Sequence, residues 1–152
     1  LRSTVVGDPA QLQNAFLNVA LNSRDAMNGS GVLSFETDEV SIDEGMIKRH
    51  AWELIPGDYI KVCITDNGVG MSKEIQQRIF EPFFTTKPVG KGTGLGLPIC
   101  YGIVKMHRGT ISAFNNEDGP GATFEIVIPV AQEEPSAPTA NGFFQPIDGG
   151  MT

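Results

Sequence analysis

The stretch that decides the fold is Gly90-Lys91-Gly92-Thr93-Gly94-Leu95-Gly96-Leu97. Glycine occupies every second position, and no residue in the stretch is acidic. Apolar residues follow at roughly helical spacing and predict a helix over 95–107, with Pro98 in the first turn, where a missing N–H costs little. A glycine-rich turn that leads into a helix presents backbone N–H groups at the positive end of the helix dipole, which favours a bound phosphate. The stretch fits neither the P-loop pattern nor the Rossmann spacing, so on its own it is also compatible with a plain flexible loop.

Composition and charge indicate one main domain that binds a small anion. The chain has 152 residues and a formal charge of −7, which argues against nucleic acid as a partner. Basic residues nevertheless gather in the central third, at Lys73, Arg78, Lys87, Lys91, Lys105 and Arg108. No apolar run is long enough to cross a membrane, and we interpret the two cysteines as buried free thiols of a reducing, cytoplasmic compartment. The chain starts without Met, so we expect a fragment of a longer protein.

The rest of the pattern predicts strands grouped between a few helices. Asp8-Pro9 is typical of a helix start, and apolar residues continue at helical spacing to about Met27. Strands are predicted over 3–6, 32–40, 58–65, 110–115 and 122–130, with a helical turn within 41–56, a short helix from 72 to about 80, and a hairpin turn over 116–121. This order predicts an α/β fold, a two-layer sandwich with a mixed sheet. The aperiodic segment 81–93 is typical of a lid, and 131–152 of a disordered tail or interdomain linker after a domain over 1–130.

Two polar features suggest a nucleotide site. Asn14, Asn18 and Asn22 share one helix face, which is either a solvent stripe or a polar wall whose carboxamides contact Mg²⁺ and phosphate. Asp66 ends a strand that reads as buried, and an acid there costs free energy unless it is satisfied. It is either part of an Asp-Asn-Gly turn or a hydrogen-bond acceptor for an adenine amino group, with Gly68 leaving room for the ring.

Four segments in order resemble the N, G1, F and G2 boxes of sensor histidine kinases: 18–27, 66–71, 80–87 and 90–97. Residues 121–124 resemble the closing Gly-x-Thr-Phe motif. The resemblance covers about residues 8–129 and implies the Bergerat (GHKL) fold of gyrase, Hsp90 and MutL-type ATPases. That fold has a mixed, mostly antiparallel sheet, three main helices packed on one face and a mobile ATP lid.

The resemblance also implies roles for individual residues. Asn22 corresponds to the Mg²⁺ ligand. Asn18 stands where related ATPases carry a general-base Glu. Because an amide cannot activate water, we expect slow hydrolysis of ATP. Asp66 corresponds to the adenine-reading acid, supported by Thr123 directly or through water. We expect Asn18 and Asn22 to be catalytic. The expected ATP-binding set is Asn18, Asn22, Asp25, Asp66, Gly68, Gly70, Met71, Thr86, Lys87, Lys91, Gly92, Thr93, Gly94, Leu95, Gly96, Leu97 and Thr123.

Departures from the family pattern limit what the resemblance implies. Ala26 stands where many members carry an aromatic residue that stacks on adenine, so the stacking partner is open; Ser23 replaces the usual Ala, and Pro98 the usual Ser. His50 and His107 are not followed by an acid, so neither fits the phosphoacceptor. We therefore expect the acceptor His on a separate dimerisation domain, which passes the phosphoryl group to a response-regulator receiver domain.

The leading hypothesis is the Mg·ATP-binding catalytic domain of a two-component sensor histidine kinase, monomeric when isolated. One alternative is a self-sufficient Bergerat ATPase. Another is a non-catalytic, nucleotide-gated interaction module that docks a partner through Phe80, Phe83 and Phe84, unless these rings pack under the lid.

Overall fold

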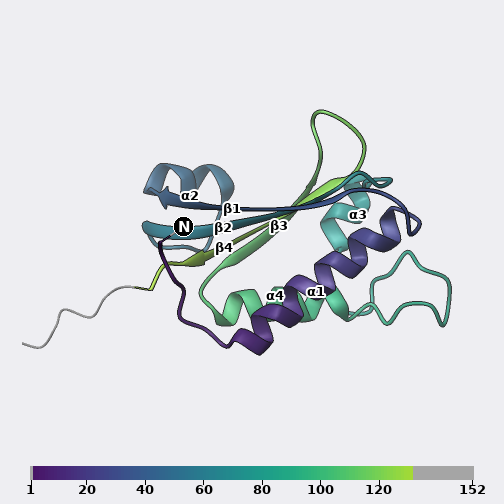
Figure 1. Ribbon diagram of the computed structural model, residues 1–152, viewed down its shortest axis with the longest axis horizontal. Helices are drawn as coiled ribbons and strands as arrows, with labels where there is room; N and C mark the ends of the chain where they lie inside the picture. Colours follow the sequence, from purple (N-terminus) through teal and green to yellow (C-terminus); the bar gives the residue numbers. More distant parts are fainter. Residues whose placement is uncertain (1, 132–152) are drawn as a thin grey trace, which may run out of the picture.

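The computed structural model describes residues 2–131, so the predicted tail lies outside the described residues except for Ala131. Its elements are α1 Pro9–Ala26, β1 Leu33–Ile42, α2 Glu44–His50, β2 Gly57–Asp66, α3 Lys73–Arg78, α4 Gly96–Met106, β3 Thr110–Asn115 and β4 Ala122–Pro129. The sheet order is β1-β2-β4-β3, and all three neighbouring pairs are antiparallel. Helices α1 and α4 lie under one face of the sheet, and α2 lies on the other side (Figure 1). The predicted α/β sandwich is confirmed.

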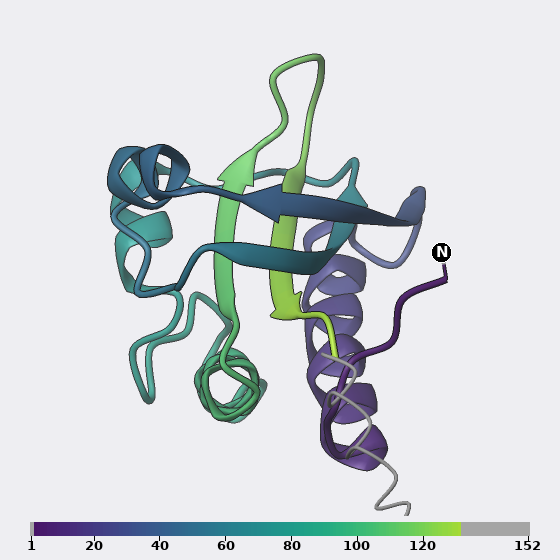
Figure 2. The ribbon, with the colours of Figure 1, turned by 90° about the vertical axis from the view of Figure 1, so that its left-hand side faces the viewer.

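Alternation along the strands divides the apolar side chains between the two faces. Phe124 and Ile126 of β4 join the main core with Val19 of α1 and Val104 of α4, and α3 adds Ile75. The next residue along β4, Val127, packs on the opposite face with Tyr59 and Ile42, beside α2. The sheet therefore has a large core under α1, α3 and α4 and a small one under α2. A view turned by 90° shows α1 and α4 side by side beneath the strands (Figure 2).

The start of α1 is fixed by its own cap and by the end of α4. The Asp8 carboxylate accepts hydrogen bonds from the N–H groups of Ala10 and Gln11, at 2.9 and 3.1 Å, as the Asp-Pro pair predicts. The Asp8 N–H donates to Nε2 of His107 at 3.0 Å. That histidine follows the last residue of α4, so the two helices that border the candidate site are joined at their far ends.

The predicted strand over 3–6 is wrong, and the helical turn within 41–56 is a regular helix. The N–H groups of Arg2 and Ser3 donate to the Glu39 side chain at 3.1 and 3.0 Å. The Thr4 carbonyl accepts from the Ala131 N–H at 2.7 Å, so segment 3–6 is held by single contacts and not by a strand ladder. In α2, Asp43 caps the Met46 N–H at 2.8 Å, a start signal that the sequence prediction did not use.

Candidate functional site

A cavity of about 570 Å³ opens between α1, α3, the segment 84–94 and the start of α4. It is lined by most of the predicted ATP-binding residues, namely Asn18, Asn22, Asp25, Gly70, Met71, Thr86, Lys87, Lys91, Gly92, Thr93, Gly94, Gly96 and Leu97. Asp66, Gly68, Leu95 and Thr123 do not line it. The N, G1, F and G2 boxes, which are far apart in the sequence, therefore border one space.

A second, larger cavity of about 1060 Å³ lies at the other end of the molecule. It is bordered by the segments 53–59, 105–109 and 129–131 and by the start of the chain, and none of the predicted site residues lines it. We place the candidate site in the smaller cavity, because that is where the carboxamides, the lid lysines and a helix N-terminus meet.

The polar face of α1 and the start of α4 form the floor of the candidate site. Asn18 and Asn22 line the cavity, and a Cβ placed on Gly96 would lie 3.7 Å from Oδ1 of Asn18. The Asn18 carboxamide therefore faces the first turn of α4. No side chain caps that helix, so its first N–H groups are available to an anion.

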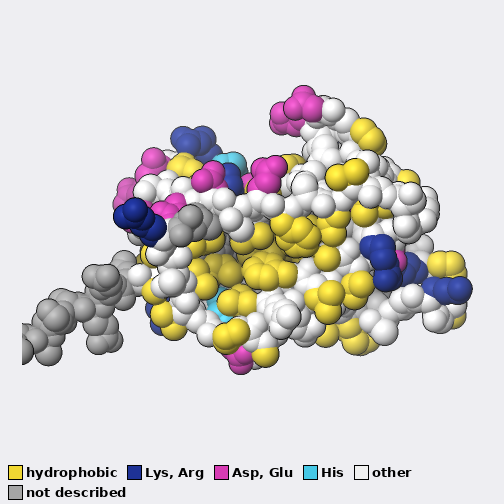
Figure 3. Space-filling model, in the orientation of Figure 1, with side chains coloured by type: hydrophobic (Ala, Val, Ile, Leu, Met, Phe, Trp, Pro, Cys, Tyr) yellow, Lys and Arg dark blue, Asp and Glu magenta, His cyan; other side chains and the backbone are white. Residues whose placement is uncertain are grey.

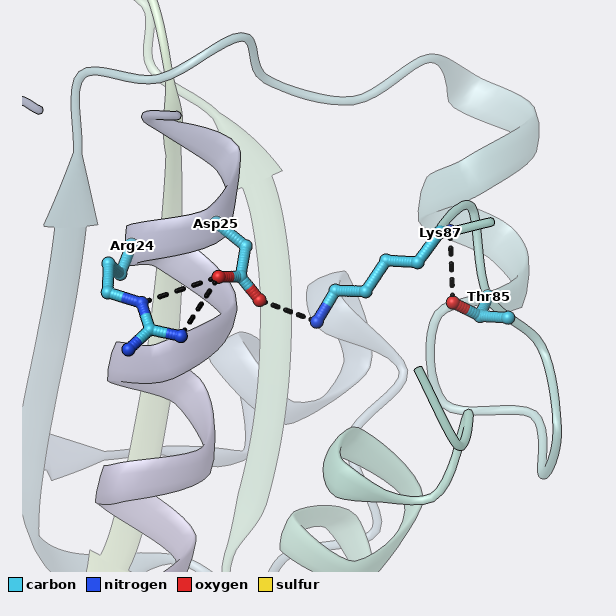
Figure 4. A network of polar contacts seen from close by, with 4 residues as sticks. All are labelled: Arg24, Asp25, Thr85 and Lys87. Atoms are coloured by element: carbon cyan, nitrogen blue, oxygen red, sulfur yellow. Dashed lines mark hydrogen bonds and ion pairs between the residues drawn. The ribbon is translucent and has the colours of Figure 1, made fainter. Parts of the chain in front are cut away.

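An ion-paired network joins α1 to the lid over 81–94 (Figure 4). Lys87 Nζ lies 2.5 Å from Oδ2 of Asp25, and Arg24 Nη2 lies 3.1 Å from Oδ1 of the same carboxylate. The hydrogen bond from Lys87 is the main cause that lowers the pKa of Asp25 below its ordinary value. The side chains of Lys87 and Asp25 remain 38% and 35% exposed, so water reaches the pair.

The two ends of the lid meet in a strained pairing. The Phe83 N–H donates to the Gly94 carbonyl at 2.9 Å, and both residues have a positive φ, +66° and +68°. A Cβ on Gly94 would come within 2.5 Å of the Phe83 backbone, so only glycine fits there. This contact, together with Lys87–Asp25, positions the lid.

The aromatic residues of the F box separate into core and surface. Phe80 and Phe84 pack against the main core, and the Arg78 guanidinium lies 4.5 Å from the centre of the Phe84 ring. Phe83 is 75% exposed. Of the three rings that the sequence offered as a docking patch, only Phe83 is largely exposed.

Asp66 belongs to a buried network at the ends of the strands rather than to the cavity wall. It is 2% exposed, and its Oδ1 accepts hydrogen bonds from the Gly68 N–H at 2.9 Å and the Ala122 N–H at 3.2 Å. Asn116 donates from Nδ2 to the Asp66 carbonyl at 2.8 Å. Oδ1 of Asp66 therefore holds the backbone at Gly68 and Ala122 in place.

Thr123 lies on the other face of the sheet from Asp66. It pairs with Thr65 across β2 and β4, and side chains alternate along a strand, so the side chains of Thr65 and Thr123 point away from Asp66. The Thr123 hydroxyl lies 3.0 Å from that of Thr65 and donates to Asn116 at 2.7 Å. The direct support for Asp66 expected from Thr123 is not formed, and Ala122 is the β4 residue that contacts Asp66.

Ser23 is buried on α1 directly after Asn22, and its hydroxyl is the one buried side-chain polar atom without a partner among the described residues. A buried hydroxyl without a hydrogen bond costs about 1–3 kcal/mol. Ser23, which departs from the family pattern, therefore lowers the stability of the fold.

Sequence reasoning missed several residues of the site. Ile75 of α3 and Ile79, the residue that follows this helix, line the cavity. Their i, i+4 spacing shortly after the G1 box was an available signal. Asn115 holds Met71 in place by accepting from its N–H at 2.8 Å and donating to its carbonyl at 2.6 Å. That contact spans 44 positions, and no local pattern announces it.

The arrangement of these boxes matches a known family. A family model described as "Histidine kinase-, DNA gyrase B-, and HSP90-like ATPase" matches residues 7–132. The chain belongs to this family. It is 40% identical over 136 residues to the sensor kinase CckA of Brucella abortus (strain 2308), covering 90% of this chain and 14% of that protein. It is 35% identical over 126 residues to the sensor histidine kinase ZraS of Escherichia coli (strain K12), covering 83% and 23%.

Solved structures of sensor histidine kinases have the same fold. The mycobacterial sensor histidine kinase MprB matches with a TM-score of 0.64 and 29% identity over 83% of this chain and 74% of that chain. Full-length ShkA in complex with AMPPNP matches with a TM-score of 0.64 and 26% identity over 86% and 24%. The chain is thus similar to the ATP-binding catalytic domain of sensor histidine kinases. The chain spans only 13–25% of the length of these curated relatives.

Within residues 2–131, no helix is both long and apolar enough to cross a membrane.

Proposed function

We propose that this domain binds Mg·ATP and that the protein to which it belongs is a protein-histidine kinase of a two-component system. The observation that carries the proposal is the convergence in one cavity of two carboxamides, the uncapped start of α4 and two lid lysines. This set suits a polyphosphate, because it offers N–H donors and positive charge. It also suits Mg²⁺, which is bound in nucleotide sites by one or two protein oxygens, substrate phosphates and water.

The polar floor and the lid supply the positioning that phosphoryl transfer needs. We assign Asn22 as the protein ligand of Mg²⁺, and Asn18 as a hydrogen-bonding partner of the phosphates, facing the start of α4. When bound, Mg²⁺ neutralises phosphate charge. Lys91 lines the cavity and has no ion-pair partner among residues 2–131, so its ammonium group is available to the phosphates.

The base of the nucleotide lies, in this proposal, between the strand-end network and α3. Met71, Ile75 and Ile79 give the cavity an apolar wall that covers an adenine ring where Ala26 offers no aromatic partner. Oδ2 of Asp66 makes no hydrogen bond to the described residues, whereas Oδ1 is committed to Gly68 and Ala122. We assign that second oxygen to the adenine amino group, and Gly68 and Gly70 to the backbone beside it.

The proposed phosphoacceptor is a histidine on a dimerisation domain elsewhere in the protein, which then serves a response-regulator receiver domain. Within this proposal the domain works in the cytoplasm, is monomeric when isolated, and contacts neither nucleic acid nor membrane. Low coverage of the curated relatives supports a protein with further domains.

Phosphoryl transfer is favoured over self-sufficient hydrolysis by the acids around the cavity. Among the described residues that line it, Asp25 is the only carboxylate, and it is paired with Lys87 and Arg24. Asn18 cannot act as a general base, and Arg24 pairs with the Asp25 carboxylate independently of Lys87. The cavity is therefore equipped to hold ATP for transfer.

The test mixes the purified domain with γ-labelled ATP, Mg²⁺ and the His-bearing dimerisation domain of the same protein. We expect label on that domain, lost with Asn22→Ala and with removal of Mg²⁺. Steady release of labelled phosphate by the domain alone, with no label on the partner, would favour the ATPase instead. Glu53→Gln is the matched control, because Glu53 is exposed, pairs with Lys105 and does not line this cavity.

A further inference from the structure

Asp25 and Lys87 join the fixed side of the cavity to its lid. Asp25 belongs to α1 and Lys87 to the irregular segment between Phe83 and Gly94. Their charged groups lie 2.5 Å apart, and the lid side holds its turn through a hydrogen bond from the Lys87 N–H to Thr85 at 3.1 Å. Together with the Phe83–Gly94 bond at the base of the lid, this ion pair fixes the lid against α1.

The same two groups lie where the proposed function places the phosphates. Both line the cavity with Asn22 and Lys91. A carboxylate there repels a polyphosphate, whereas an ammonium group attracts it. An ammonium carries three donors on a flexible stem, so Lys87 can exchange one anionic partner for another without a change in the backbone.

We propose that the Asp25–Lys87 ion pair is a latch that closes the lid in the nucleotide-free domain, and that the phosphates of an incoming nucleotide take Lys87 from Asp25. The second part of this inference, the displacement of Asp25 by the phosphates, rests on the proposed function. Asp25 thus acts on the nucleotide through Lys87 as a competitor and not as a ligand.

The exposure of the pair makes such an exchange feasible. Both side chains are about one-third exposed, and exposed ion pairs contribute little because water and salt screen them. The lid between its two ends is also lightly held, since Val89 is fully exposed and a Cβ on Gly90 would meet nothing within 4 Å. A weak pair that closes a lightly held segment can be opened by a polyphosphate, which carries more charge than one carboxylate.

Limited trypsin digestion of the nucleotide-free domain tests the latch. Trypsin does not cut before proline, so Lys87-Pro88 resists it, whereas Lys91-Gly92 is the cleavable bond in the middle of the lid. Cleavage of a transiently open segment follows the open population. We expect Asp25→Asn and Lys87→Gln each to speed cleavage at Lys91 about two- to fivefold, the range for an exposed pair. The double variant should cleave no faster than either single variant, because both remove one interaction.

Two controls isolate the ion pair. A synthetic peptide of residues 83–97, with and without Lys87→Gln, corrects for any effect of that residue on trypsin itself. Glu53→Gln removes a different acid from a different ion pair and should leave the cleavage rate unchanged. Equal cleavage of wild type and Asp25→Asn, or additive effects in the double variant, would overturn the latch.

Nucleotide binding by calorimetry, with Mg²⁺ and a non-hydrolysable ATP analogue, tests the exchange. Asp25→Asn should bind about two- to fivefold more tightly, because Lys87 is released and a repelling charge is removed. Lys87→Gln should bind more weakly, although its lid opens as easily. Weaker binding by Asp25→Asn would overturn the exchange and make Asp25 a ligand. If the wild type bound no nucleotide, the proposed function and the exchange would fail, while the cleavage comparison would still decide whether the latch closes the lid.

Discussion

The strand-end network lies directly behind the cavity wall, against Met71, whereas the lid borders the cavity itself. The two regions are built differently. The strand-end network of Asp66, Asn115, Asn116, Gly121 and Ala122 is held by hydrogen bonds of 2.6–3.2 Å, and Asp66 is almost fully buried. The lid over 81–94 has a single backbone bond between its ends and one exposed ion pair to α1. Figure 3 shows the apolar centre of this side of the molecule between the sheet and the helices, with dark-blue basic side chains both at the α2 end and at the lid end. The difference indicates that the base side is fixed before a ligand arrives and that the phosphate side is able to rearrange.

The largest expected effect comes from Gly121→Ala in the strand-end network. Gly121 has a φ of +99°, and a Cβ there would overlap the Asp66 carbonyl. We expect a loss of about 2–5 kcal/mol in the free energy of unfolding, from backbone strain and overpacking together. Urea denaturation measures it. Gly102→Ala is the control, because Gly102 lies inside α4 with open space around it and should gain up to about 1 kcal/mol. A Gly121→Ala domain as stable as wild type would mean that the network is not fixed.

Asp66→Ala should cause the second-largest loss of stability, because it leaves the N–H groups of Gly68 and Ala122 without an acceptor. Only the Ala122 contact is buried, and a buried donor left unpaired costs about 1–3 kcal/mol, whereas water reaches the part-buried Gly68 N–H; the proposed adenine contact is lost as well. We expect lower stability by urea denaturation and no measurable ATP binding by calorimetry. Asp66→Asn keeps an acceptor oxygen and should restore most of the stability but not the nucleotide binding. Tight ATP binding by Asp66→Ala would contradict the adenine assignment.

Gly90→Ala makes the same substitution in the lid, also at a positive φ of +82°. No atom lies within 4 Å of the added Cβ, and the lid backbone is free to relax. We expect a loss of about 1 kcal/mol in the free energy of unfolding, because the strain of a Cβ at a positive φ acts here without any overpacking. A loss as large as that of Gly121→Ala would show that the lid is as firmly packed as the strand ends.

The pH dependence of the Asp25–Lys87 pair is the smallest expected effect. Lys87 lowers the pKa of Asp25 below its ordinary value of 3.8, so the stabilisation by this pair is fully present above that value. It is lost as the pH falls through the lowered pKa. A carbon NMR titration of Asp25 should show a midpoint below 3.8, which moves up in Lys87→Gln. An unchanged midpoint in that variant would mean that Lys87 does not hold the carboxylate in solution.

Local patterns predicted much of the fold and only part of the site. The Asp8-Pro9 cap, the hairpin over 116–121 and the strand that ends at Asp66 follow from short-range chemistry, and the structure confirms them. The prediction for segment 3–6 failed because the segment is held by single contacts with distant residues, from the Ser3 N–H to Glu39 and from the Ala131 N–H to the Thr4 carbonyl. Contacts of this kind depend on the register and order of the strands, which no local pattern sets.

The candidate site divides in the same way. Asn18, Asn22 and the glycine-rich stretch were predicted from spacing and resemblance, and they meet in one cavity. The clamp of Asn115 on Met71 and the wall of Ile75 and Ile79 depend on tertiary contacts. Thr123 shows the limit of motif matching, because a shift of one residue along a strand moves a side chain to the other face. Ala122, one position earlier, is the residue beside Asp66.

Calorimetric titration of the domain with ATP, with and without Mg²⁺, tests the central claim most directly. The account predicts saturable binding of one nucleotide per chain that weakens strongly without Mg²⁺ and in Asn22→Ala, and that is unchanged in Glu53→Gln. An absence of binding, or binding that ignores both Mg²⁺ and Asn22, would contradict the assignment of this cavity as a Mg·ATP site.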